Sequence, residues 1–91
     1  LPENGVYGAK VYFKDKVYLG MVNIGYNPTF TALPGLSLEV NILDFDENIY
    51  GQVLTVAFIK KIRMEKKFAS VEGLIEQLKH DRQQIKNEII L

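Results

Sequence analysis

The chain has 91 residues, 47% of them hydrophobic and 24% charged, a balance that is typical of a single globular domain. Eleven basic residues offset eleven acidic ones, so no overall charge favours a nucleic acid or a membrane surface as partner. The lack of cysteine excludes disulfides and thiolate metal sites, and no apolar run is long enough to span a membrane. We therefore expect a cytoplasmic domain with one site.

The first part of the chain predicts a β-hairpin. Residues 5–14 are rich in β-branched and aromatic side chains and are too short for a stable helix. Polar residues 14–16 interrupt this run, and the apolar pattern resumes over 17–25, which indicates two antiparallel strands. Pro28 then ends the second strand because proline cannot donate a ladder hydrogen bond, and a loop through Gly35 follows.

Residues 36–43 alternate most clearly. We expect one apolar face, formed by Leu36, Leu38, Val40 and Ile42, and one mostly polar face, formed by Ser37, Glu39, Asn41 and Leu43. A turn cluster covers residues 44–51. The longer run 52–62 has bulky residues at both odd and even positions. Both faces of such a strand are apolar, which predicts a strand that is covered on both faces.

The C-terminal segment predicts one amphipathic helix. Ser70 is a suitable N-cap for a helix that begins at Val71. The predicted apolar stripe consists of Val71, Leu74, Ile75, Leu78, Ile85 and Ile89. Several short strands followed by one helix predict a mainly β fold: a small antiparallel Greek-key-like β-barrel closed by a C-terminal α-helix, since closure removes exposed edges.

The common cofactor motifs are absent. The chain has no phosphate-binding P-loop, dinucleotide GxGxxG or zinc-type HExxH pattern. A calcium-loop spacing occurs at Asp44, Asp46 and Asn48. However, Ile49 and Thr55 stand where such a loop needs glycine and glutamate, which favours a solvated turn. His80 lies off the apolar stripe, and nothing places it near a nucleophile.

Glu39 is the one charged side chain in its strand. A carboxylate at the rim of a barrel can accept a hydroxyl proton, but the alternation by itself favours an ordinary solvent-facing residue. Arg63, Glu65 and Phe68 follow the long strand and fit either a charged connector with an aromatic anchor or a ligand-holding loop. Both readings remain open for these residues on pattern alone.

Five short motifs occur in a fixed order along nearly the whole chain. They are Leu1-Pro2 with Gly5-Val6-Tyr7, Asn23-Ile24-Gly25 with Asn27-Pro28-Thr29-Phe30, Glu39-Val40, Asp44-Phe45 with Ile49-Tyr50-Gly51, and Ile62-Arg63-Met64-Glu65 with Lys67-Phe68. In this order and spacing they resemble the riboflavin kinase module that forms the C-terminal part of bacterial bifunctional riboflavin kinase/FAD synthetases. The expected barrel and helix agree with that family's fold.

The resemblance implies transfer of the terminal phosphoryl group of ATP to the ribityl 5′-hydroxyl of riboflavin, giving FMN, with Mg²⁺ bridging the nucleotide phosphates. It implies that Glu39 is the general base. The flavin-binding residues it implies are Arg63, Glu65 and Phe68, and the nucleotide-binding residues are Asn27, Phe45 and Tyr50. Riboflavin/FMN and ATP/ADP are then the ligands, with no nucleic acid or membrane as partner.

One departure concerns the metal. The family's magnesium motif is a Gly-rich stretch ending in Pro-Thr-Ala-Asn, and it lies upstream of the segment at which this chain begins. We therefore expect residues 1–91 to be a riboflavin kinase domain truncated at its N-terminus, with an adenylyltransferase domain in the parent chain, and we assign no metal ligation to Thr29. The alternative is a barrel that binds flavin or a partner without turnover. A nucleic-acid-binding barrel is disfavoured by the balanced charge.

Overall fold

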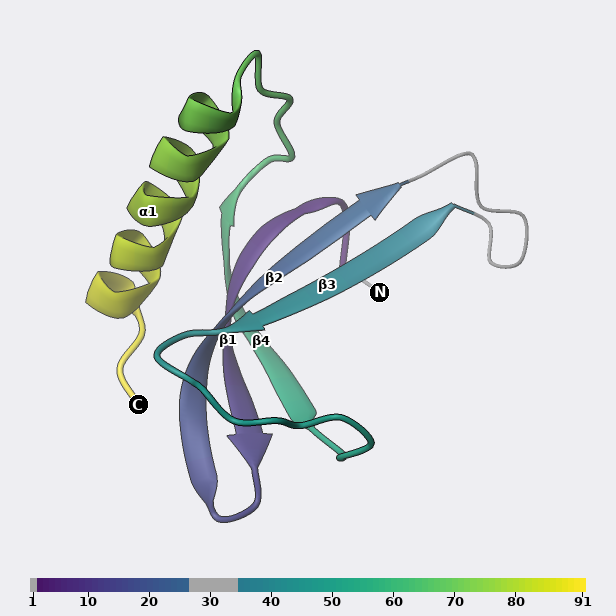
Figure 1. The fold of residues 1–91 in the computed structure, drawn as a ribbon, viewed down its shortest axis with the longest axis vertical. Helices are drawn as coiled ribbons and strands as arrows, with labels where there is room; N and C mark the ends of the chain where they lie inside the picture. Colours follow the sequence, from purple (N-terminus) through teal and green to yellow (C-terminus); the bar gives the residue numbers. More distant parts are fainter. Residues whose placement is uncertain (1, 27–34) are drawn as a thin grey trace.

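The computed structural model describes residues 2–26 and 35–91, and within them it has four strands and one helix (Figure 1). The elements are β1 (Gly5–Phe13), β2 (Lys16–Tyr26), β3 (Leu36–Ile42), β4 (Thr55–Arg63) and α1 (Val71–Glu88). All strand pairs are antiparallel, in the order β3-β2-β1-β4. This order is that of a Greek key, since β4 returns by a long connection to lie beside β1. The mainly β antiparallel fold with a C-terminal helix is confirmed.

The described strands form an open, twisted sheet, whereas the sequence predicts a closed barrel. β3 and β4 lie at opposite edges, and within residues 2–26 and 35–91 each of them pairs with a single neighbour (Figure 1). Alternating hydrophobicity identifies strands and their faces. It does not determine whether the two edges meet, because closure depends on the number of strands and their stagger.

The sheet buries apolar side chains on both of its faces. One core cluster contains Tyr7, Ala9, Val22 and Ile24, with Val56 and Phe58 packed against it. The other joins α1 to the sheet and contains Leu43, Ile85 and Ile89, with Leu19, Met21 and Ile62 packed against it. We call the second side of the sheet the helix face. The central strand β1 is consequently buried along most of its length.

The two edge strands are less covered than the sequence predicts. On β3, the predicted core residues Leu38 and Val40 are 54% and 38% exposed. On β4, which was expected to be covered on both faces, Ile59 is 50% exposed. The prediction was wrong for both strands because an apolar pattern reports what a strand can bury, whereas an edge strand has one neighbour fewer to cover it.

Helix α1 begins where the sequence predicts. The side chain of Ser70 accepts a hydrogen bond from the backbone N–H of Gly73 at 3.1 Å, which makes Ser70 the N-cap. Of the predicted stripe, only Ile85 and Ile89 are buried. The other four members of the stripe, Val71, Leu74, Ile75 and Leu78, are exposed. The C-terminal half of the apolar face therefore anchors the helix to the sheet, and the N-terminal half is left uncovered by the described residues.

Candidate functional site

A row of cross-strand partners runs across the helix face of the sheet. Arg63 of β4 pairs with Val6 of β1, Val6 pairs with Asn23 of β2, and Asn23 pairs with Glu39 of β3. Directly opposed residues point to the same side of a sheet, and Asn23 shares its side with Leu19 and Met21, which contact the helix cluster. Glu39, Asn23 and Arg63 therefore lie on one face, and three strand spacings of about 4.8 Å separate the two ends of the row.

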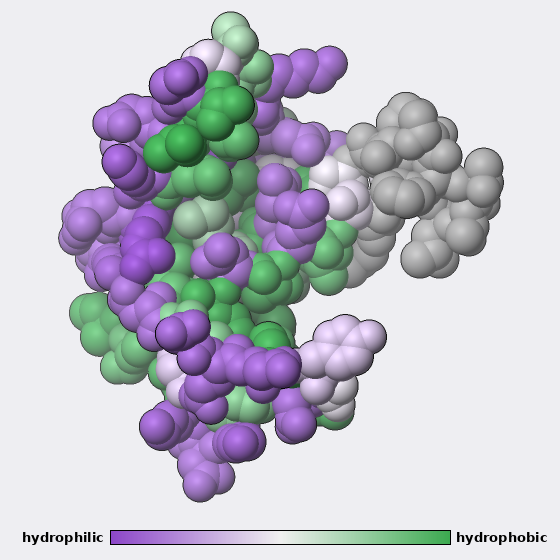
Figure 2. All heavy atoms as spheres, in the orientation of Figure 1, coloured by the Kyte–Doolittle hydropathy of each residue, from purple (hydrophilic) through white to green (hydrophobic). Residues whose placement is uncertain are grey.

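The next row along β2 and β3 forms the floor of a groove beside α1. Met21 and Asn41 are cross-strand partners, two residues from Asn23 and Glu39 respectively. The groove has a volume of about 220 Å³ and is lined by Met21, Asn41 and Leu43 together with Ile75, Leu78, Lys79 and Arg82 of α1. Figure 2 shows hydrophobic residues gathered between the helix and the sheet, with hydrophilic residues around them. The Asn23–Glu39 pair forms the next row on this face, about 7 Å further along the strands, with Glu39 exposed and Asn23 half-buried.

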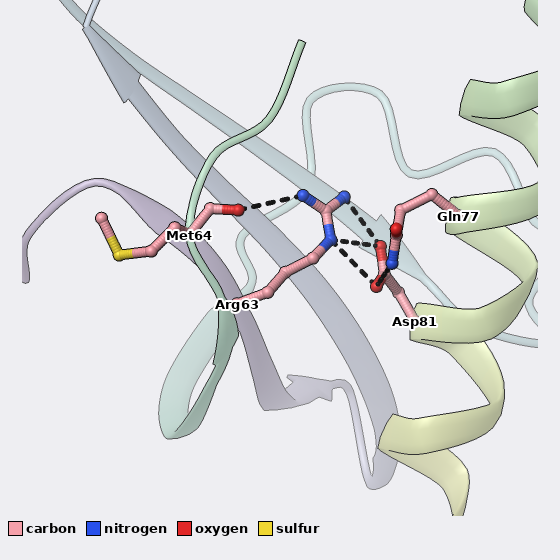
Figure 3. A network of polar contacts seen from close by, with 4 residues as sticks. All are labelled: Arg63, Met64, Gln77 and Asp81. Carbon is pink, nitrogen blue, oxygen red and sulfur yellow. Dashed lines mark hydrogen bonds and ion pairs between the residues drawn. The ribbon is translucent and has the colours of Figure 1, made fainter. Parts of the chain in front are cut away.

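Arg63 ties the sheet to the helix (Figure 3). Its Nε donates to both carboxylate oxygens of Asp81 at 3.0 Å, and its Nη2 donates to Oδ2 at 2.8 Å. Gln77, one turn earlier on α1, donates to Asp81 Oδ1 at 2.9 Å, and Arg63 Nη1 donates to the carbonyl of Met64. Asp81 is fully buried. Two of the five N–H groups of Arg63, Nε–H and one of Nη2, therefore hold α1, and with it one wall of the groove.

Sequence reasoning missed Asp81 and Gln77. Both stand on the polar side of the predicted helix, where a charge at this spacing is typical of a solvated surface. A bidentate pair to an arginine on a distant strand leaves no local signal, because its partners are 18 residues apart in the chain.

Glu65 and Phe68 continue from β4 along the same end of the sheet. The carboxylate of Glu65 lies against Gly25, where an added Cβ would stand 2.6 Å from Glu65 Oε1. Gly25 is two residues from Asn23 on the helix face of β2. Phe68 lies under the guanidinium of Arg63, with 5.9 Å between the guanidinium carbon and the ring centroid. The three predicted flavin-binding residues are thus gathered at the end of the sheet that holds Glu39.

The predicted nucleotide-binding residues lie elsewhere. Phe45 packs edge-on against Phe13 and Tyr18, with centroid distances of 5.8 and 4.9 Å, near the β1–β2 hairpin. Tyr18 is five residues from Asn23 on β2, about 17 Å away. Tyr50 is 94% exposed. The structure therefore places Phe45 away from the Glu39 row, whereas Asn27 lies outside the described residues.

Asp44, which follows β3, pairs with the C-terminal part of α1. Its carboxylate lies 2.8 Å from Lys86 Nζ and also pairs with Arg82. The hydrogen bond from Lys86 is the main cause that holds the pKa of Asp44 below its ordinary value of 3.8, and the charges of Lys86 and Arg82 act in the same direction. Asp44 is thereby an ion-pair partner of the helix.

This lowered pKa predicts a small loss of stability in acid. A carboxylate with a lower pKa in the folded chain stabilises the fold above its unfolded value, and that contribution is lost as the pH falls through the folded value. Asp44→Asn should therefore lower the urea midpoint slightly near neutral pH, and the difference from wild type should shrink below pH 3.8. Because Asp44 is exposed, salt should also reduce the difference. A difference that is unchanged across this pH range would contradict the assignment.

The described residues do not by themselves form a divalent-metal site. Within residues 2–26 and 35–91, no group of three His, Cys, Asp or Glu side chains could hold a metal ion. Glu39 has an amide, Asn23, as its cross-strand partner rather than a second carboxylate. In the same ranges, no helix has the length and apolar character needed to cross a membrane.

Comparison with known proteins gives the family. Residues 1–89 match the family described as Flavokinase, riboflavin kinase. The chain belongs to the riboflavin kinase family. The bifunctional riboflavin kinase/FMN adenylyltransferases of Bacillus subtilis (strain 168) and Listeria monocytogenes serovar 1/2a are 40% and 46% identical to it, over 92% and 91% of this chain. The chain spans only 27% and 26% of the length of these two relatives.

Two further matches extend the family picture. An RNA-binding riboflavin kinase of Bacillus subtilis (strain 168) is 38% identical over 86% of this chain, which spans 34% of that protein. A crystal structure described as a macrolide-efflux protein from Streptococcus pneumoniae superposes with a TM-score of 0.84 at 35% identity, over 98% of this chain and 29% of the other. The family that the motif order indicated is confirmed, and so is the mainly β architecture with a C-terminal helix.

Proposed function

We propose that the chain is a riboflavin kinase domain that transfers the γ-phosphoryl group of ATP to the 5′-hydroxyl of riboflavin, giving FMN. Family membership supports this activity. The observation that carries it is that the Met21–Asn41 row, which lines the groove beside α1, is followed on the same face by the Asn23–Glu39 row. An apolar groove with a carboxylate one row further along the strands suits a ligand with a flat ring at one end and a hydroxyl to be deprotonated at the other.

The groove is the proposed binding site of the isoalloxazine ring. Its walls carry Met21, Leu43, Ile75 and Leu78, and binding pockets for ring systems are mostly apolar with a few polar groups at the margin. The polar side chains along it are Asn41, Lys79 and Arg82. With the ring so placed, the ribityl chain extends along β2 and β3 toward Glu39, about 7 Å away.

Glu39 is the proposed general base. Its carboxylate takes the proton of the 5′-hydroxyl while the hydroxyl oxygen forms a bond to the γ-phosphorus of ATP. The bond between that phosphorus and the β–γ bridging oxygen breaks, and ADP leaves with the electron pair. Phosphoryl transfer depends chiefly on positioning and charge stabilisation, so the base must be held in line with the groove. An edge strand that pairs with β2 gives Glu39 that fixed place.

The other proposed roles follow the predicted residues. Glu65 and Phe68 close the flavin site at the end of β2, and Arg63 contributes by fixing α1 and by stacking on Phe68. Phe45, Tyr50 and Asn27 are proposed to contact the nucleotide, which is ATP with Mg²⁺. Because both bifunctional relatives are about four times longer than this chain, we propose that its parent is a cytoplasmic enzyme that also adenylates FMN.

Riboflavin fluorescence tests the groove directly. Leu78 lines the groove and is 41% exposed, so Leu78→Glu should leave the fold intact but place a charge against the ring. We expect riboflavin to bind the wild-type chain with quenched fluorescence and to bind Leu78→Glu at least about tenfold more weakly. Val71→Glu, at a more exposed position of the same helix that does not line the groove, is the matched control.

Two outcomes would decide against the proposal. If Leu78→Glu and Val71→Glu bound riboflavin with equal affinity, the groove would not be the flavin-binding site. If the chain bound riboflavin but formed no FMN from MgATP, it would be a flavin-binding module and not a kinase. Chromatographic separation of riboflavin and FMN after incubation with MgATP distinguishes the two functions.

A further inference from the structure

Asn23 carries an unexplained acceptor in the middle of the proposed site. Its side-chain carbonyl oxygen Oδ1 is buried and has no hydrogen-bond partner among the described residues. It is the one buried side-chain nitrogen or oxygen atom of residues 2–26 and 35–91 that lacks a partner. By contrast, the fully buried carboxylate of Asp81 receives hydrogen bonds from two residues. This unpaired oxygen therefore stands out among the buried polar side chains of the described residues.

An acceptor of this kind has a cost for the folded chain. A buried polar atom without a partner loses its hydration and gains nothing in return, which typically costs more than a made hydrogen bond contributes. An apolar residue of similar shape would avoid this cost, and the two preceding positions on the same face of β2, Leu19 and Met21, are in fact apolar. The carbonyl at position 23 is therefore not explained by packing.

The register places this acceptor beside Glu39. Asn23 and Glu39 are direct cross-strand partners, so their Cβ atoms stand about 5 Å apart on the helix face. The groove floor at Met21 is two residues away on the same strand. A ligand that extends from the groove to Glu39 therefore enters the cross-strand row that also holds Asn23.

We propose that the half-buried side chain of Asn23 turns on ligand binding, so that Oδ1 accepts a hydrogen bond from a hydroxyl of the bound ligand's polyol chain, next to the hydroxyl that Glu39 deprotonates. This inference rests on the proposed flavin site and adds a ligand-binding residue to it. A polyol donates through each of its hydroxyls, whereas the carboxylate of Glu39 is an acceptor and cannot satisfy Oδ1. Asn23 thus selects for a hydroxylated side chain on the ring.

A pair of flavins separates this role from a structural one. Riboflavin carries the ribityl chain, and lumiflavin carries a methyl group at the same ring position. Asn23→Leu should weaken riboflavin binding about tenfold and leave lumiflavin binding unchanged, as measured by fluorescence titration of both flavins. Asn41→Leu is the matched control, because it removes an amide from the same face in the groove and should act alike on both flavins.

A second measurement needs no ligand. Since Asn23→Leu removes an unsatisfied buried acceptor, the free variant should melt at the same temperature as wild type or higher. A structural asparagine would instead lower the melting temperature and weaken both flavins equally, and that result would overturn the proposal. If neither flavin binds the wild-type chain, the proposed flavin site itself fails. If the wild-type chain binds both flavins and Asn23→Leu binds them equally well, only the role of Asn23 fails.

Discussion

Glu39→Gln should reduce the rate of FMN formation by about 10²- to 10⁴-fold while riboflavin affinity changes little. The amide keeps the size and most of the polarity of the side chain but cannot accept the hydroxyl proton. Glu39 is exposed on an edge strand, so the substitution should leave the fold and the groove intact. The measurement is the initial rate of FMN formation with saturating riboflavin and MgATP, alongside a riboflavin titration.

The matched control for this prediction is Glu76→Gln. Glu76 is an exposed carboxylate on α1 that does not line the groove, and its neutralisation changes the net charge by the same amount. It should leave the rate of FMN formation unchanged. A Glu39→Gln chain with the wild-type rate would show that the carboxylate is a surface residue, as the strand alternation alone suggests.

Asp81→Ala should lower the free energy of unfolding by about 3–5 kcal/mol. Asp81 is fully buried, and its carboxylate receives hydrogen bonds from Arg63 and Gln77. Without Asp81, the mostly buried guanidinium of Arg63 loses its counter-charge and α1 loses a fixed contact to β4. Urea denaturation followed by circular dichroism measures the change.

Two further variants test the reason for this loss. Replacing both partners, as in Arg63→Met with Asp81→Leu, should restore most of the stability because no charge is then left buried alone. Glu88→Ala breaks the Lys60–Glu88 pair on the surface, where solvent screens the charges, and should change stability little. If Asp81→Ala were no worse than Glu88→Ala, the buried pair would not be what fixes α1.

The sequence predicts the individual elements better than their assembly. The alternation over residues 36–43, the polar break before Lys16 and the N-cap at Ser70 are local signals, and the structure has β3, the hairpin and α1 at these places. Burial at the edges could not be predicted, because Leu38 and Ile59 have the same side-chain types as core residues. Their exposure depends on having one neighbouring strand instead of two.

The candidate site was predictable only in part for a related reason. Motif order identifies the family, and with it Glu39, Arg63, Glu65 and Phe68. The partners that give these residues their setting come from register and docking: Asn23 opposes Glu39, and Asp81 binds Arg63. A cross-strand pair or a helix-to-strand ion pair leaves no spacing in the sequence by which it could be recognised.

Because α1 is buried unevenly, its last turns should resist local opening more than its first turns. Ile85 and Ile89 are packed into the sheet near one end, Asp81 is bound to Arg63 in the middle, and Leu74 and Ile75 near the other end are exposed. Amide hydrogens in the last turns should therefore exchange with solvent only through large openings of the fold, whereas those of the first turns should exchange through local fraying. A ligand held in the groove against Ile75 and Leu78 would slow exchange in the first turns most, so flavin occupancy can be followed along one helix.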